Sequence, residues 1–291
     1  MKVFLVDNGS LRAESVLNLR RVARDLSADT GLEILPASVL HSSKIPAEKL
    51  EGVAAINLER RIRLSLESGD DREFTILPFF FGPTGAITDY LPERLAHRRK
   101  KHGDFKVWQL PFLGDEGRRT KDERRRTKDE GPQVVADDLV EILADRVREV
   151  IGREGLACPR VALVDHGSPK REVTALRDVI AGELRSRLGE AVADVAASSM
   201  ERRMGEAYAF NEPLLERLLD RPGWDCGDVV VSMLFLSPGR HAGPGGDVDT
   251  ICKEAEARHP GLRTVMTGLV GDHPDIVPLL KRRLAGERVE L

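Results

Sequence analysis

Short apolar runs and longer amphipathic segments alternate along the whole chain. The runs at 3–6 and 161–164 are unbroken and rich in β-branched residues, which is typical of parallel strands buried on both faces. In the stretches between such runs, apolar residues recur every three or four positions, which predicts amphipathic helices. This alternation predicts an α/β fold with mostly parallel sheets and helices on both faces.

The pattern predicts a similar series of elements in each half of the chain. In the first half, strands are predicted at 2–7, 33–37, 74–81 and 107–112, and helices at 11–28, 48–68, 88–100 and 134–152. In the second half, strands are predicted at 161–165, 192–198, 228–236 and 263–269, and helices at 169–188, 205–220, 247–258 and 274–284.

The two halves also resemble each other in sequence. Leu-Val-Asp-Asn-Gly-Ser at 5–10 matches Leu-Val-Asp-His-Gly-Ser at 163–168, and three later pairs of blocks match as well. The offsets of the four pairs are 158, 157, 155 and 157 residues, which is nearly constant and far too long for a solenoid repeat. We therefore predict an internal duplication with two copies of one α/β unit.

A charged stretch separates the copies. We predict a first lobe at 1–116, a linker at 117–133 and a second lobe at 134–291, with the helix at 134–152 as the element that could pack on the first lobe. The linker contains Arg-Arg-Thr-Lys-Asp-Glu twice in tandem and cannot bury apolar surface. Because acidic residues interrupt the basic ones, we interpret it as a solvated loop and not as a basic docking tail.

Composition narrows the class of protein. Hydrophobic residues make up 41% and charged residues 32%, and the net charge of −3 argues against nucleic acid as a partner. No apolar run approaches the ~20 residues of a membrane span, and the N-terminus turns acidic too early for a signal peptide. The three cysteines lack metal-ligand spacing and fit a reducing compartment, so we expect a cytoplasmic protein.

Two histidines follow predicted strands of the second copy. His166 comes directly after the strand at 161–165, where Gly167 lets the backbone turn, and His241 follows the strand at 228–236. Ligands bind outside the carboxyl ends of strands in open α/β sheets, so we expect both imidazoles at one site. The corresponding residues of the first copy are Asn8 and Ala86, which indicates a role in a site and not in packing.

These imidazoles suit two kinds of chemistry. A neutral imidazole binds borderline divalent metals through one ring nitrogen, and it can also accept a proton as a general base. Two imidazoles with open coordination positions would form an exchangeable metal site, unlike a closed structural zinc site. We predict that His166 and His241 are both metal ligands and catalytic residues.

Acidic and basic residues lie in the loops at the same strand ends. Glu201, Glu206 and Glu212 are the carboxylate candidates, and we select Glu206 as the catalytic one. Lys170, Arg171, Arg202, Arg203 and Arg240 are the basic candidates for binding a polyanion, since arginine binds carboxylates with two parallel hydrogen bonds. From this group we predict Arg202 and Arg240, together with Ser168, as substrate-binding residues. No glycine-rich phosphate-binding motif occurs, so no nucleotide is expected.

These motifs resemble those of a known family. Asp-His-Gly-Ser at 165–168, Leu-Phe-Leu-Ser-Pro-Gly-Arg-His at 234–241, Tyr-Ala-Phe-Asn-Glu-Pro at 208–213 and Gly-Asp-His-Pro at 271–274 are similar to the sirohydrochlorin chelatase family, the class II chelatases. The resemblance covers 161–284 well and 1–115 as a degenerate copy. The first copy departs from the family at Asn8 and Ala86, where the family has histidines.

The resemblance carries definite implications. It implies two tandem flavodoxin-like lobes with a tetrapyrrole cleft between them, and it implies that His166 and His241 handle the metal. It implies insertion of Co²⁺ or Fe²⁺, with Ni²⁺ as a third option, into sirohydrochlorin, as in cobalamin or siroheme biosynthesis. A doubled chain supplies the twofold arrangement that a single lobe reaches by dimerising, so a monomer is expected.

Two other functions are compatible with parts of the pattern. A non-catalytic carrier could bind a tetrapyrrole or a metal on the same scaffold without turnover. Phosphoryl transfer through a phosphohistidine is suggested by Arg240-His241, but it would need an arginine cluster that the His-Gly-Ser motif lacks.

Overall fold

The structure is a computed structural model that describes residues 2–69, 71–115 and 135–291. It divides into two units. One unit comprises the described residues up to 115 together with Pro274–Leu291, and the other runs from residue 135 to His273. The predicted linker at 117–133 lies outside the described residues.

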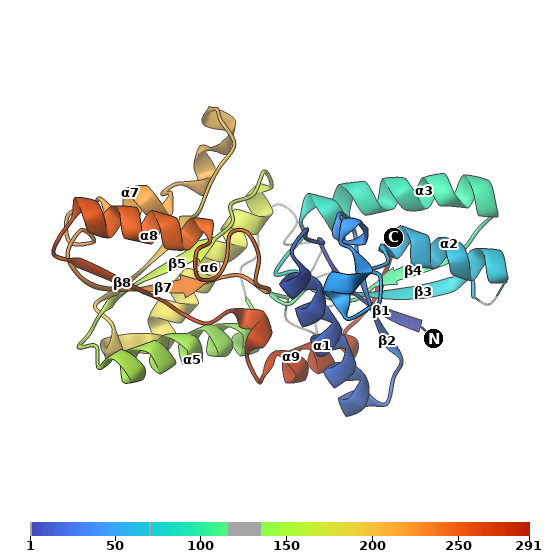
Figure 1. The fold of residues 1–291 in the computed structure, drawn as a ribbon, viewed down its shortest axis with the longest axis horizontal. Coiled ribbons are helices and arrows are strands. Elements are labelled where there is room, and N and C mark those ends of the chain that lie inside the picture. The colour runs from blue at the N-terminus through green and yellow to red at the C-terminus, as the bar shows by residue number, and fades with distance from the viewer. Residues whose placement is uncertain (1, 70, 116–134) are drawn as a thin grey trace. The chain divides into compact units, whose positions relative to one another are not determined.

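The first unit is built on a five-stranded sheet in the order β2-β1-β3-β4-β9 (Figure 1). Strands β1 to β4 are parallel and β9 is antiparallel to β4. The strands are β1 (Lys2–Asp7), β2 (Ile34–Ser38), β3 (Glu73–Pro78), β4 (Lys106–Gln109) and β9 (Val289–Glu290). The helices are α1 (Ala13–Thr30), α2 (Leu58–Ser68), α3 (Leu91–His102) and α9 (Ile276–Leu284).

The core of this unit follows from the alternation of side chains along each strand. Phe4 and Phe74 point to the face covered by α2 and α3, where they pack with Ile62 and Leu95 in one buried cluster. Helices α1 and α9 pack against each other, and α9 also contacts β3. Both faces of the sheet are therefore buried, which accounts for the unbroken apolar runs in the sequence.

Two elements of this unit differ from the prediction. The helix expected at 48–68 is interrupted, because Gly52 has a φ of 78° and only α2 continues as regular helix from Leu58. The C-terminal segment, predicted within the second lobe at 134–291, belongs instead to the first unit. There β9 pairs with β4, and the buried guanidinium of Arg283 donates to the carbonyl oxygens of Phe112 and Leu113 at 3.1 and 2.8 Å.

The second unit is built on a four-stranded parallel sheet in the order β6-β5-β7-β8. Its strands are β5 (Arg160–Asp165), β6 (Asp194–Ser199), β7 (Gly227–Met233) and β8 (Leu262–Met266). Its helices are α5 (Asp137–Glu154), α6 (Arg171–Leu188), α7 (Leu215–Leu219) and α8 (Asp247–Arg258).

Helices cover both faces of this sheet as well. Helices α7 and α8 pack on one face around Val164 and Val231, and α5 lies on the opposite face (Figure 1). Helix α5 contacts α6 and β7, so the helix predicted at 134–152 packs within the second unit. The helix predicted at 205–220 is instead a 3₁₀ segment at Glu206–Asn211 followed by the short helix α7.

The two units repeat one arrangement. The order β2-β1-β3-β4 of the first sheet corresponds to β6-β5-β7-β8 of the second, with parallel pairing throughout these strands. The predicted fold class, two tandem flavodoxin-like lobes with mostly parallel sheets, is confirmed. Among the described residues, no helix is long and apolar enough to cross a membrane.

Candidate functional site

The first half of the site is a tight turn at the carboxyl end of β5. Gly167 has a φ of 90°, and a Cβ atom placed on it would lie 1.9 Å from the carbonyl oxygen of Glu201. The amide of Gly167 donates to the carboxylate of Asp165 at 3.0 Å, and the amide of Glu201 donates to the carbonyl of His166 at 3.2 Å. A glycine is therefore required, and the turn joins the chain after β5 to the chain after β6.

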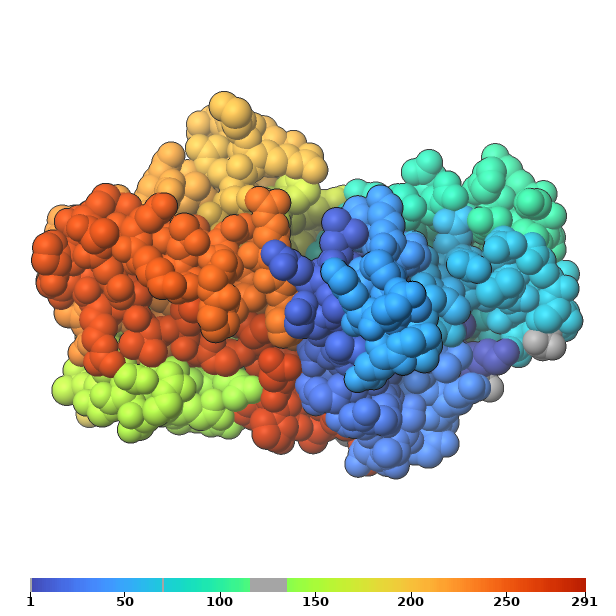
Figure 2. All heavy atoms as spheres, in the orientation of Figure 1, coloured from blue at the N-terminus to red at the C-terminus, as the bar shows by residue number. Residues whose placement is uncertain are grey.

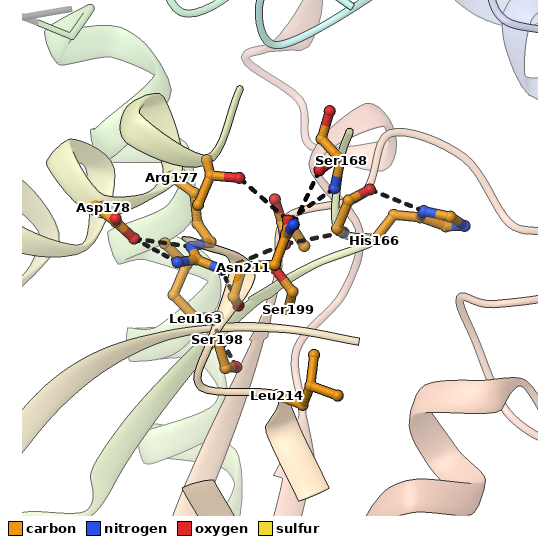
Figure 3. A network of polar contacts seen from close by, with 12 residues as sticks. Leu163, His166, Ser168, Arg177, Asp178, Ser198, Ser199, Asn211 and Leu214 are labelled. Carbon is orange, nitrogen blue, oxygen red and sulfur yellow. Dashed lines mark hydrogen bonds and ion pairs between the residues drawn. The ribbon is translucent and has the colours of Figure 1, made fainter. Parts of the chain in front are cut away.

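A buried polar network holds this turn from below (Figure 3). The hydroxyl of Ser199 donates to Asp165 at 2.6 Å and accepts a hydrogen bond from the guanidinium of Arg177 at 2.5 Å. The side chain of Asn211 accepts from the amide of Ser168 and donates to its carbonyl, both at 2.9 Å. Burial raises the pKa of Asp165, and the charge of Arg177 opposes that effect. The ring of His166 points away from this network (Figure 3).

The second half of the site is the loop between β7 and α8. The amide groups of Asp247 and Val248, at the start of α8, donate to the carbonyl oxygens of Arg240 and His241, both at 3.2 Å. The Nδ1 atom of His241 lies 2.6 Å from the carboxylate of Asp247. The loop is thus fixed by the first turn of α8, whose free N–H groups need acceptors.

The two imidazoles lie together, as predicted. Their ring centroids are 4.6 Å apart and their planes are inclined at 80°. His166 and His241 leave 47% and 31% of their side chains exposed, so a ligand in solution can reach both. The predicted convergence of these side chains from two strand ends is observed.

Each imidazole has a defined hydrogen-bonding partner. The Nδ1 atom of His166 lies 3.1 Å from the carbonyl oxygen of Gly167, and a carbonyl can only accept. The Nδ1 atom of His241 faces a carboxylate, which favours a proton on that nitrogen too. In the neutral form of each imidazole, the lone pair that can bind a metal ion is then on Nε2.

The acidic candidates occupy different surroundings. The carboxylate of Glu201 lies 3.6 Å from Nε2 of His166 and is 60% exposed. Glu212 is engaged with Arg202 and Arg217, and although burial raises its pKa, the hydrogen bond from Arg202 helps to hold the pKa below its usual value. Glu206 begins the 3₁₀ segment and is exposed, and among the described residues no hydrogen bond or ion pair joins it to either histidine.

The predicted substrate-binding residues also differ from one another. The hydroxyl of Ser168 accepts from the amide of Lys170 at 3.1 Å and can still donate to a ligand. Arg202 donates to Glu212 at 2.7 Å and to the carbonyl of Gly205 at 3.1 Å, so it holds its own loop together. Arg240 is 75% exposed and lies 3.6 Å from Asp247.

Sequence reasoning missed three residues that position the site. Asp247 is the acceptor for His241, and Arg177 and Asn211 secure the turn that carries His166. A carboxylate at the first position of the helix that follows a histidine loop was a usable signal for Asp247. No local pattern pointed to Arg177, and the motif at 208–213 gave Asn211 no role, because the partners of these two residues lie 22 and 43 residues away along the chain.

Comparison with known proteins gives two kinds of match. The CbiX family model matches residues 160–287, whereas the search of curated proteins gave no match. Among solved structures, SirB from Bacillus subtilis with Fe³⁺ aligns with a TM-score of 0.66 at 12% identity, covering 97% of this chain and 93% of that one.

A second solved structure agrees. The sirohydrochlorin chelatase SirB from Bacillus subtilis subspecies spizizenii in complex with cobalt aligns with a TM-score of 0.63 at 13% identity, covering 97% and 92% of the two chains. At such low identity these two likenesses establish the fold. The match of residues 160–287 to the CbiX family model confirms the resemblance to the sirohydrochlorin chelatase family that the sequence predicted.

Proposed function

We propose that this chain is a tetrapyrrole metal chelatase that inserts Co²⁺ or Fe²⁺ into sirohydrochlorin. The observation that supports it most directly is the pair of imidazoles 4.6 Å apart at the ends of neighbouring strands, each with Nδ1 directed at an acceptor. The similarity of this fold to the SirB structures with iron and with cobalt supports the same proposal. The same proposal includes Ni²⁺ as a third possible metal and a role in cobalamin or siroheme synthesis. It also includes a cytoplasmic location and a monomeric state.

The chemistry of insertion defines what the residues must do. A free macrocycle carries two pyrrole N–H protons that block the metal, and holding the ring bent exposes nitrogen lone pairs on one face. His166 and His241 hold the incoming ion through Nε2 and release it to the macrocycle. Two imidazoles leave coordination positions of the ion open for exchange, unlike the four ligands of a closed structural site.

A proton acceptor is needed beside the metal-binding pair. Glu201 is exposed and lies 3.6 Å from Nε2 of His166, whereas no ion pair joins Glu206 to either histidine among the described residues. We therefore assign proton transfer to Glu201, in place of Glu206. Asp247 orients His241, and Ser168 and Arg240 remain as groups that could bind the macrocycle.

The test is a chelation assay followed by visible absorbance. Purified protein is mixed with metal-free sirohydrochlorin and Co²⁺, Fe²⁺ or Ni²⁺, and His166→Ala and His241→Ala are each expected to abolish insertion. His259→Ala is the matched control, because His259 also faces an aspartate, Asp220 at 2.7 Å, but follows α8 at the opposite end of that helix. Wild-type rates in both site variants would refute the proposal.

The carboxylate assignment has its own test. Glu201→Gln is expected to lower kcat by about 10² to 10⁴-fold, the usual contribution of a general base, while Glu206→Gln stays near the wild-type rate. The reverse ranking would restore Glu206 as the catalytic carboxylate.

A non-catalytic carrier is the second candidate function. A carrier would bind the macrocycle or the metal in a one-to-one ratio without accelerating insertion, and it would have no use for the carboxylate beside His166. Multiple turnovers per protein in the chelation assay separate the two functions.

A further inference from the structure

An arm projects from the second unit between β6 and α7, and we define it as residues 200–214. Figure 1 shows it as the amber segment that extends beyond the sheet, and Figure 2 shows it raised above the surface around it. Its two ends meet, because the amide of Ser199 donates to the carbonyl of Pro213 at 3.1 Å. Asn211, at its base, is the residue that pins the turn of His166. The arm is thus anchored directly beside the histidine pair.

The corresponding segment of the first unit, between β2 and α2, has a different structure. There the chain after β2 returns to the sheet through a bridge between Ser38 and Asn57, just as Ser199 bridges to Leu214. Between those points, Ile45 and Leu50 are buried and pack against Val16 of α1. The first copy uses this segment to extend its core, whereas the second leaves Met204 95% exposed.

The surface of the arm carries two arginines stacked on aromatic rings. The guanidinium of Arg171, the first residue of α6, lies 4.6 Å from the ring centroid of Phe210, and that of Arg203 lies 5.8 Å from the centroid of Tyr208. The two rings are 6.3 Å apart, so the four residues form one continuous arginine–aromatic stack. Both arginines are exposed.

The charges of this stack are not neutralised by the protein. Within the part of the chain that the structure describes, neither Arg171 nor Arg203 has an ion pair, whereas neighbouring Arg202 is bound to Glu212 and Arg240 lies near Asp247. A guanidinium that lies over an aromatic ring loses less freedom on binding an anion, and its N–H groups can still donate. Planar forks of this kind bind carboxylates with two parallel hydrogen bonds.

We infer that Arg171 and Arg203, held by Phe210 and Tyr208, bind carboxylate side chains of the macrocycle and select for polycarboxylated tetrapyrroles. This inference rests on the proposed function, since it takes the tetrapyrrole as the ligand of the histidine site. Arg202 was predicted to bind these carboxylates, but its guanidinium is paired with Glu212. We therefore assign the contacts to Arg171 and Arg203. The macrocycle is held by its periphery, on residues that take no part in binding the metal.

The test measures binding of metal-free uroporphyrin, an octacarboxylated macrocycle, by fluorescence titration of the full chain. Arg171→Gln and Arg203→Gln are each expected to weaken binding about tenfold, as for the loss of one charge-assisted hydrogen-bond pair. Phe210→Leu keeps both charges but removes one stacking platform, so a smaller loss is expected. Arg221→Gln is the matched control, because Arg221 is exposed and lies between α7 and β7, on the connection that enters the opposite end of the sheet.

Two further measurements separate this inference from the proposed function. Co²⁺ affinity is expected to be unchanged in Arg171→Gln and Arg203→Gln, and KM for sirohydrochlorin should rise while kcat is preserved. The wild type could insert no metal and yet bind uroporphyrin more tightly than the two variants do. In that case the carboxylate site stands and the chelatase proposal fails. If the wild type does not bind uroporphyrin, or the variants bind it as tightly as Arg221→Gln does, the inference is overturned even where metal insertion is observed.

Discussion

The turns that follow β1 and β5 have the same backbone but different side chains. Gly9 has a φ of 88° and Gly167 one of 90°, and a Cβ on either would lie 1.9 Å from a carbonyl oxygen of the next loop, that of Leu40 or Glu201. In both turns an aspartate at the strand end is buried. The backbone geometry has therefore been kept in both copies.

The side chains around the two turns differ in kind. The offset of 158 residues holds for both the glycines and the first residues of α1 and α6, so Leu19 occupies the position of Arg177. Asp165 thus has a buried cation nearby, whereas Asp7 relies on hydrogen bonds from Ser38 and Gly9. The exposed residue of the turn is Asn8 in one copy and His166 in the other.

The backbone of the turn and the side chains that could carry chemistry are therefore separable. Within the described part of the first unit, the turn has no histidine in it and no arginine beneath it, and the chain after β2 packs into the core. The histidine of the second turn is therefore unnecessary for the fold, which supports its role in a site. Substitutions at the two glycines, at Arg177 and at Asp7 test this separation, from the largest expected change in stability to the smallest.

Gly9→Ala and Gly167→Ala are expected to be the most damaging. Each would force a Cβ against a carbonyl oxygen, so each should lower the free energy of unfolding of its unit by more than about 3 kcal/mol. The two tryptophans divide between the units, Trp108 in the first and Trp224 in the second, so urea unfolding followed by fluorescence reports each unit in a variant that lacks the other tryptophan.

Gly152→Ala is the control for these substitutions. Gly152 lies within α5 with nothing within 4 Å of an added Cβ, so alanine there should stabilise the second unit by about 0.5–1 kcal/mol. A harmless substitution at Gly9 or Gly167 would show that the two turns do not share the constrained geometry.

Arg177→Leu places in the second unit the residue type that the first unit has at this position, Leu19. It removes the cation near Asp165 and the donors to Ser199 and the carbonyl of Asn211, and the expected cost is about 3 kcal/mol. Arg185→Leu, on the exposed side of the same helix, should cost under about 1 kcal/mol. If Arg177→Leu and Arg185→Leu lower the free energy of unfolding equally, as measured through Trp224, leucine stabilises the second turn as well as arginine does.

Asp7 gives the first unit a pH-dependent stability. Burial raises its pKa from 3.8 to about 6, so the folded state favours the protonated form. That contribution is complete below pH 4 and is lost as the pH rises through about 6. Relative to Asp7→Asn, the wild type should therefore lose up to about 3 kcal/mol between pH 4 and pH 7.5, as followed through Trp108. A constant difference over that range would place the pKa of Asp7 near its ordinary value.

Much of the fold was predictable because its signals are local. The apolar run at 161–164 and the helix Asp247–Arg258 appear where periodicity puts them, and the repeat of Asp-x-Gly-Ser identified the duplication. The place of α9 and β9 was not predictable, because it depends on pairing between β4 and β9 across more than 170 residues. The break before α2 was missed because Gly52 in a positive-φ turn looks like any glycine within a helical pattern.

The site divides in the same way. His166 and His241 were found because each follows a strand and neither has a counterpart in the first copy. The choice between Glu201 and Glu206 could not be made from sequence, since both lie on one loop and their directions depend on how the arm folds. The arginines could not be ranked from sequence for the same reason, because the ion pair with Glu212 distinguishes Arg202 from Arg203 only in three dimensions.

We propose that the two imidazoles of the second unit form the metal-binding site and that the first unit lacks such a site. Titration of Co²⁺ into the full chain, followed by its visible absorption, tests this without the macrocycle. We predict one site in the wild type, weaker binding by about 100-fold in His166→Ala and in His241→Ala, and no change in Asn8→Ala. Undiminished Co²⁺ affinity in both histidine variants would contradict the account.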